Sequence, residues 1–143
     1  MSKYFNLIEM VHSDTADIKH IDNSPNEEER QHLIELMEIL DSLRAFVGVP
    51  LKVTSGFRCA RLNKAVGGAA ASAHVIGYAA DLVPMKGSFD GFIQKAKLWA
   101  ETSGVDFDQL LIEKNSKGKR WLHFGLYNQK GEQRKQIKNL YVQ

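Results

Sequence analysis

The sequence has little of what would mark a specialised class of protein. Cys59 is the only cysteine, so no disulfide can form within the chain and the thiol count does not indicate a compartment. No hydrophobic run approaches the length of a membrane span, and residues 1–10 lack a signal peptide's apolar core. The formal charge is only +2, without the overall basic footprint of a nucleic-acid-binding protein. We therefore expect a protein made in the cytoplasm, with no membrane or nucleic-acid partner.

What is present is the composition of an ordinary globular protein. The chain has 143 residues, of which 43% are hydrophobic and 25% are charged. A chain of this length can bury roughly two thirds of its unfolded surface around one core. We find no internal repeat, low-complexity segment or linker. The sequence therefore predicts a single domain over residues 1–143, and we expect a monomer.

The first third of the chain predicts a short lead-in followed by a long helix. Residues 4–23 have a helical or irregular character, with packing contacts expected from Phe5, Leu7, Ile8 and Met10. Ser24 can cap the next helix, Pro25 suits its first turn, and Glu27 would complete a capping box. Gly48 and Pro50 end it. Its apolar residues recur at helical spacing and predict one buried face, made of Leu33, Leu36, Met37, Leu40, Leu43 and Val47.

The remainder predicts short strands between helices. Strands are expected over Leu51–Thr54, Ala79–Val83, Leu110–Glu113 and Arg120–Tyr127, and helices over Cys59–Val66 and from Ser88 to Gly104. The polar tail after Gly131 suits an edge strand or a frayed end. This order predicts an α+β fold with a small mixed or antiparallel sheet and flanking helices.

The stretch from Ser72 to Asp81 holds the residues with the most chemical character. His74 and Asp81 are seven positions apart, and a straight helix would separate their Cα atoms by ~10 Å. A bend at Gly77, or a loop followed by a short strand, would instead bring the two side chains together; the sequence does not choose between them. Either arrangement lets one imidazole and one carboxylate reach the same Zn²⁺ at ~2 Å.

A third ligand is expected from His123. In the strand around it, Leu122 and Phe124 point to one side while Trp121 and His123 point to the other. His123 therefore lies off the apolar face, on a surface that suits a substrate groove. The other histidines, His12, His20 and His32, are predicted to be surface residues, and Cys59 a small packed thiol.

Four motifs in this order resemble the zinc D-Ala-D-Ala carboxypeptidases of the M15 peptidase family. They are Thr54-Ser-Gly-Phe-Arg58, Leu62-Asn63, Ser72-x-His-x-x-Gly-x-Ala-x-Asp81 and Trp121-x-His123. The resemblance is nearest to the short, phage- and prophage-associated branch. It begins near Asn6 and runs to about Tyr127.

The resemblance implies a Hedgehog/DD-peptidase-like fold and a catalytic zinc held by His74, Asp81 and His123. Three protein ligands leave a fourth position for water, as in catalytic zinc sites. It also implies that Arg58 binds the substrate carboxylate or steadies the oxyanion, and that Ser72 contacts substrate. A guanidinium matches a carboxylate through two parallel hydrogen bonds.

The chain departs from some relatives at one position. They carry an acidic residue three positions before the last histidine, where this chain has Arg120. Glu113, at the end of the preceding strand, is our candidate for the general base. Whether Glu113 faces His123 depends on the hairpin register, since a shift of one residue reverses the face.

We therefore predict a zinc metallopeptidase that hydrolyses peptidoglycan stem-peptide bonds involving D-amino acids, as a carboxypeptidase or endopeptidase. A phage or prophage lysin, released to the cell wall when another protein opens the membrane, would suit the absence of an export signal. One alternative is a cytoplasmic D-Ala-D-Ala dipeptidase. The other is a non-catalytic, zinc-containing wall-binding module, which the missing acid at position 120 favours.

Overall fold

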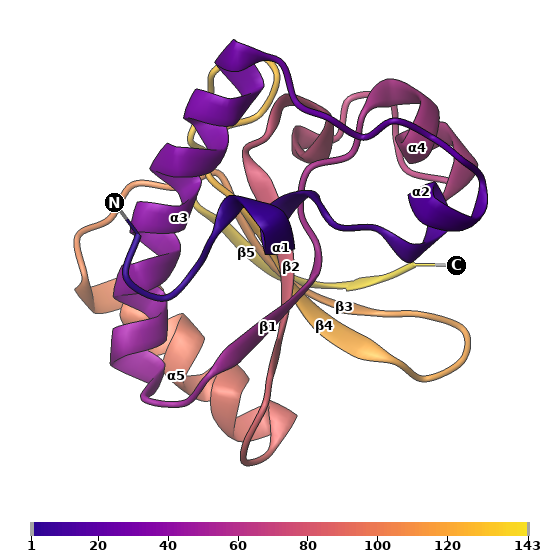
Figure 1. Cartoon of the computed structure of the whole chain (residues 1–143). Coiled ribbons are helices and arrows are strands. Elements are labelled where there is room, and N and C mark those ends of the chain that lie inside the picture. Colours follow the sequence, from indigo (N-terminus) through magenta and orange to yellow (C-terminus); the bar gives the residue numbers. More distant parts are fainter. Residues whose placement is uncertain (1, 143) are drawn as a thin grey trace.

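The computed structural model describes residues 2–142 and is built around a five-stranded sheet (Figure 1). The strands lie in the order β1-β2-β4-β3-β5, and all neighbours are antiparallel except β3 and β5, which are parallel. The predicted α+β class and mixed sheet are confirmed. The strands are β1 (Leu51–Ser55), β2 (Ala79–Pro84), β3 (Gln109–Lys114), β4 (Arg120–Gly125) and β5 (Gln136–Tyr141).

Two long helices, α3 (Glu27–Val47) and α5 (Phe89–Thr102), pack on one another and cover one face of the sheet. The shorter helices are α1 (Leu7–Val11), α2 (Asp14–Ile18), α4 (Ala60–Ala65) and a 3-10 turn, η1 (Ala73–Ile76). All six residues of the predicted apolar face of α3 are buried. Full burial of such a side chain contributes about 1.5–3 kcal/mol, so this face anchors the helix to the core.

The start of α3 differs from our prediction. Its cap is Asn26 rather than Ser24, and Glu29 rather than Glu27 completes the capping box. The Asn26 side chain accepts from the backbone N–H of Glu29 at 2.8 Å, and the Glu29 side chain accepts from the backbone N–H of Asn26 at 2.9 Å. The Ser24 hydroxyl donates instead to Asp22. A capping box needs its acid three residues after the cap, and both pairs satisfy that spacing.

The lead-in forms the short helices α1 and α2, which was one of the two alternatives, but Ile8 does not pack. Phe5 and Met10 are buried, whereas Ile8 is 83% exposed because it lies on the outer side of the short helix α1. The polar tail after Gly131 forms β5, an edge strand, which was one of the two alternatives.

The two faces of the sheet have different roles. Leu82, Leu110, Leu122 and Phe124 point toward the helices and are buried in the core, where Trp99 of α5 packs edge-on against Phe124 at 5.8 Å. Because side chains alternate along a strand, the residues between them project from the opposite face. That second face carries Asp81 and His123.

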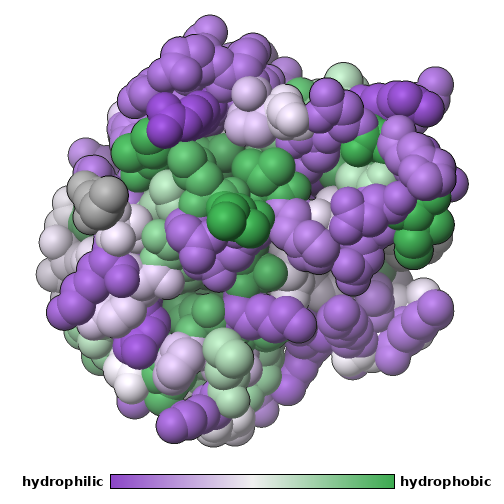
Figure 2. Space-filling model, viewed as in Figure 1, coloured by the Kyte–Doolittle hydropathy of each residue, from purple (hydrophilic) through white to green (hydrophobic). Residues whose placement is uncertain are grey.

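The surface is mixed, with hydrophobic side chains visible between α3 and α1 and hydrophilic ones covering the protruding β3–β4 hairpin (Figure 2). Among residues 2–142, none of the helices combines the length and hydrophobicity that crossing a membrane requires.

Candidate metal centre

Strand register brings two of the predicted ligands side by side. Asp81 of β2 pairs directly with His123 of β4, and His123 pairs with Leu111 of β3. Residues that pair in this way have Cβ atoms ~4.5–5.5 Å apart and point to the same side of the sheet. The sheet alone therefore places one carboxylate next to one imidazole.

His74 reaches the same point from a 3-10 turn that precedes β2. The Ser72 hydroxyl caps this turn by accepting from the His74 N–H, and Gly77 ends it with φ +84°. A Cβ on Gly77 would lie 2.7 Å from the Glu29 carbonyl oxygen of α3, so only glycine allows the turn to approach the helix so closely. Of the two arrangements that the sequence left open, a turn followed by a strand is the one observed.

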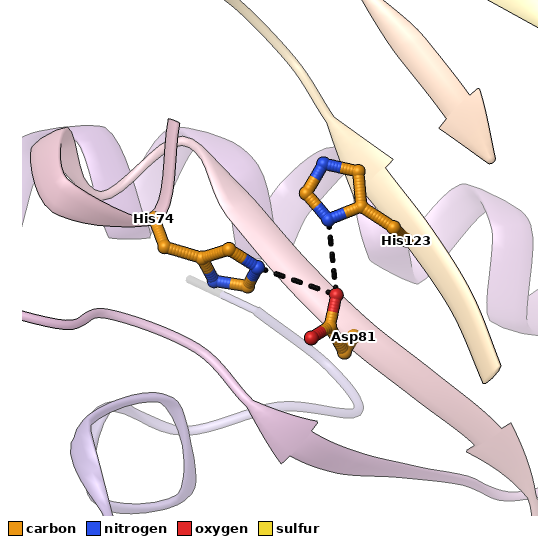
Figure 3. Close-up of side chains that lie close together, drawn as sticks. All are labelled: His74, Asp81 and His123. Atoms are coloured by element: carbon orange, nitrogen blue, oxygen red, sulfur yellow. Dashed lines mark hydrogen bonds and ion pairs between the residues drawn. The ribbon is translucent and has the colours of Figure 1, made fainter. Parts of the chain in front are cut away.

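The two imidazoles, of His74 and His123, converge on one oxygen of the Asp81 carboxylate (Figure 3). His74 Nε2 lies 3.2 Å from Asp81 Oδ1, and His123 Nδ1 lies 3.0 Å from the same oxygen. All three residues are buried, with exposed fractions of 2%, 8% and 8%. No water layer therefore separates these groups, and their charges act on one another at short range.

The second nitrogen of His74 fixes where its hydrogen lies. His74 Nδ1 is 2.7 Å from the Gly56 carbonyl oxygen, which can only accept, so Nδ1 carries the hydrogen. Burial lowers the pKa of His74 more than the nearby Asp81 raises it, which favours the neutral ring. Nε2 is therefore the nitrogen that faces Asp81 Oδ1, at 3.2 Å, and the one that can bind a metal ion.

His123 and Asp81 have shifted pKa values for the same reason. Burial alone would lower the pKa of His123, but the hydrogen bond and charge of Asp81 outweigh it and raise the pKa. Burial alone would raise the pKa of Asp81, but the two histidines outweigh it and lower that pKa well below its usual range. The cluster therefore holds a carboxylate anion that attracts a positive charge.

The donor set fits a zinc ion. Zinc takes histidine nitrogens and carboxylate oxygens at about 2.0–2.2 Å, and its tetrahedral ligand atoms lie roughly 3.3 Å from one another. The measured separations of 3.2 and 3.0 Å match that spacing. The hydrogen bond that His74 Nδ1 donates to the Gly56 carbonyl oxygen is the kind of outer contact that typically orients a metal-bound histidine. Within residues 2–142 the only other group with this potential is the exposed set His12, Asp14 and Asp17.

A cavity of about 690 Å³ opens over the cluster. Arg58 and Ser72, the two residues predicted to contact substrate, both line it. The Arg58 guanidinium donates from Nε to Asn63 Oδ1 at 3.1 Å and from Nη1 to Ser55 Oγ at 3.2 Å. Within the described chain Arg58 has no carboxylate within 4.0 Å, so its charge is available to a ligand.

Glu113 lies in the same cavity and on the same face as His123. The register pairs Glu113 with Trp121, two residues before His123, and the Trp121 indole donates to Glu113 Oε1 at 2.7 Å. Burial raises the pKa of Glu113, with His123, Trp121 and Arg58 acting in the opposite direction. The carboxyl is therefore fixed in orientation and made more basic than an exposed glutamate.

Other predicted positions lie away from the cluster. Arg120 pairs with Asp90 at 2.8 Å, and Cys59 caps α4 by accepting from the Leu62 N–H. His12 and His20 are exposed as predicted. The surface assignment of His32 is wrong: it is half-buried, stacked on Tyr78 at a ring distance of 4.0 Å and bonded to the Ile76 carbonyl.

Sequence reasoning missed several groups that support the site. The Gly56 carbonyl, which orients His74, comes from a turn packed against α1, where a Cβ would lie 2.2 Å from the Met10 oxygen. Asn63 and Ser55 hold Arg58, although both lie in the quoted motifs. The bond from Trp121 to Glu113 was also missed; its signal was the hairpin itself, which places the two residues opposite each other.

The comparison with protein families now identifies the class. The Peptidase M15 family matches residues 3–117, most of the chain, and the chain belongs to that family. The match includes His74, Asp81 and Glu113 and ends before His123, which the geometry adds. The search of curated proteins gives no match. The protein is thus a member of a peptidase family with a candidate His-Asp-His metal site.

Proposed function

We propose that the protein is a zinc peptidase that cleaves peptidoglycan stem peptides next to a D-amino acid. The observation that carries this proposal is the convergence of His74, Asp81 and His123 at the floor of a cavity, in a member of the M15 family. Together with the shared carboxylate oxygen, their separations match the spacing that a tetrahedral zinc requires.

The residues have distinct roles in this proposal. Zinc, when bound by His74, Asp81 and His123, polarises the scissile carbonyl and makes a water molecule more acidic. Glu113 orients that water and accepts its proton, then returns the proton to the leaving amine. The raised pKa of Glu113 suits a group that must both take and give a proton.

Arg58 and Ser72 hold the substrate. The Arg58 side chain is fixed by Asn63 and Ser55, which leaves its Nη2 and the remaining hydrogen of Nη1 for a carboxylate. Charge-assisted bonds of this type typically contribute about 1.5–3 kcal/mol. Ser72, at the cap of the turn that carries His74, also lines the cavity.

The proposal is tested by incubating the purified protein with intact cell walls and with a synthetic stem peptide ending in D-Ala-D-Ala. New amino and carboxyl termini, seen by mass spectrometry and lost when a chelator removes the metal, support a metallopeptidase. Binding to the walls without new termini would contradict it. That result would favour the non-catalytic wall-binding module, in which Arg120 replaces a required acid.

A further inference from the structure

Charge is distributed very unevenly along this chain. Residues 114–143 contain eight lysines and arginines and one acidic residue, a net charge of +7, so the preceding 113 residues carry −5. The overall charge of +2 hides this contrast. A charge difference between two parts of a chain points to a surface that binds a ligand of opposite charge.

Most of these cations form no ion pair with the residues that the structure describes. Three are paired with aspartates: Arg120 with Asp90, Arg134 with Asp108, and Lys135 with Asp106. Within residues 2–142 the other five form no ion pair, and they are Lys114, Lys117, Lys119, Lys130 and Lys138. The hydrophilic hairpin that protrudes from the sheet carries three of them (Figures 1 and 2).

One of the five lysines lines the substrate cavity, and a second projects from the face of the sheet that borders it. Lys117 lines it directly, from the tip of the β3–β4 hairpin. That tip is held in shape by Asn115, whose Oδ1 accepts from the N–H groups of Lys117 and Lys119, both at 3.0 Å. Lys138 of β5 pairs with Leu111, which is itself in the cavity floor, so Lys138 projects from the same face.

The strand register gives the distance between Lys138 and the metal centre. Asp81, His123, Leu111 and Lys138 form one row across four strands. Strands are ~4.8 Å apart, so Lys138 lies two spacings, or roughly 10 Å, from His123. Arg58 lies beyond the other end of the row, where its Nη1 donates to Ser55, the residue paired with Asp81. An extended peptide rises about 3.3 Å per residue, so roughly 10 Å corresponds to three residues.

We propose that Lys117 and Lys138 form a second anion subsite, which binds a side-chain carboxylate of the substrate about three residues before the scissile bond. This rests on the proposed peptidase function. A peptide lying across the strands would place its C-terminal side at Arg58 and its N-terminal side at Lys138, while Lys117 faces the same cavity from the hairpin tip. Carboxylates are the anionic groups that unmodified peptides carry, so the preferred substrate is an acidic peptide.

The test uses two peptides that differ only in charge, acetyl-Glu-Ala-D-Ala-D-Ala and its counterpart with Gln in place of Glu. We expect kcat/KM to be about two- to five-fold higher for the acidic peptide, since an exposed ion pair typically contributes a factor of this size. In the double variant Lys117→Gln/Lys138→Gln this ratio should fall toward one. The matched control is Lys114→Gln, which removes the same charge from β3 but on the opposite face.

The outcomes separate this inference from the proposed function. Cleavage of both peptides at equal rates would overturn the subsite but still support the peptidase. The same holds if Lys114→Gln lowers the ratio of the two kcat/KM values as much as the double variant does. If neither peptide is cut, the proposed function fails, and calorimetric binding to the Glu113→Gln protein decides the subsite. The subsite is supported if the acidic peptide binds more tightly than the neutral one and if the double lysine substitution weakens that binding. Equal binding of the two peptides, or no binding, overturns the subsite.

Discussion

Two groups in this protein are built from the same two residue types, histidine and aspartate, but differ in burial and geometry. In the buried group, His74 and His123 direct one nitrogen each at the same oxygen of Asp81, and the side chains are 2%, 11% and 11% exposed. In the surface group, His12 directs Nε2 at Asp14 at 2.9 Å and Nδ1 at Asp17 at 3.9 Å, with side chains 58–89% exposed.

The difference shows what a metal centre needs beyond the right residues. One ion cannot bind both nitrogens of a single imidazole, so the arrangement around His12 does not converge on a point. Water also competes for exposed carboxylates, and ion pairs there contribute little, about 0–1 kcal/mol. Convergence and burial, rather than residue type, distinguish the candidate centre.

The largest loss of activity is expected from replacing Glu113, the carboxylate in the same cavity as the buried group. Glu113→Gln keeps the shape of the side chain and removes its basicity, so kcat should fall by ~10²–10⁴-fold while bound zinc and the melting temperature persist. Steady-state kinetics with the stem peptide, alongside metal analysis, provide the measurement. Asp14→Asn, a similar change in the surface group, is the control and should leave kcat unchanged. Activity of Glu113→Gln within a few-fold of the parent would exclude Glu113 as the base.

A smaller loss is expected at the carboxylate-binding end of the cavity. Arg58→Ala should lower kcat/KM by about ten- to a hundred-fold for a peptide with a free C-terminal carboxylate, because a charge-assisted contact is removed. A peptide amidated at its C-terminus should lose much less. An equal loss on both peptides would mean that Arg58 acts on the oxyanion or on the fold.

The pH dependence of metal binding should distinguish the two groups further. Because Asp81 raises the pKa of His123, the metal-free cluster holds a proton on His123 that zinc must displace. Apparent zinc affinity should therefore rise about tenfold per pH unit below that pKa and level off above it. In the metal-free protein the same proton stabilises the fold below pH ~6.5, and this contribution is lost as pH rises through the raised pKa. Calorimetric titrations with zinc over a pH series test this, and an affinity independent of pH would contradict it.

The smallest effect is expected in the surface group. His12→Ala should change the free energy of unfolding by no more than about 1 kcal/mol, because it removes only exposed ion pairs. Urea denaturation measures this directly. Loss of zinc or of activity in this variant would show that the surface group belongs to the functional site.

Periodicity predicted the elements of the fold because it reports burial directly. The apolar face of α3 is buried as predicted, and around His123 the two sides differ as predicted, with Leu122 and Phe124 in the core and Trp121 and His123 at the cavity. Ile8 was mispredicted because α1 has too few residues to define a face. The cap of α3 was misplaced by two residues because Ser24 and Asn26 offer the same chemistry.

The site could be predicted only because the order of the family motifs was available. The pairing of Asp81 with His123 joins two β-strands 42 positions apart, and no local pattern encodes it; the family motif order supplied it instead. His32 was taken for a surface residue because its partner, Tyr78, lies 46 positions away. The phage association and the release to the cell wall rest on the resemblance, and both of them, like the monomeric state, remain predictions.

Metal analysis of the purified protein tests the central claim most directly. Without added metal, the parent and His12→Ala should each retain close to one zinc per chain, and His74→Ala should lose it. Circular dichroism would confirm that all three proteins are folded. A near-stoichiometric zinc content in folded His74→Ala, or zinc lost from His12→Ala instead, would contradict the assignment of the buried group as the metal centre.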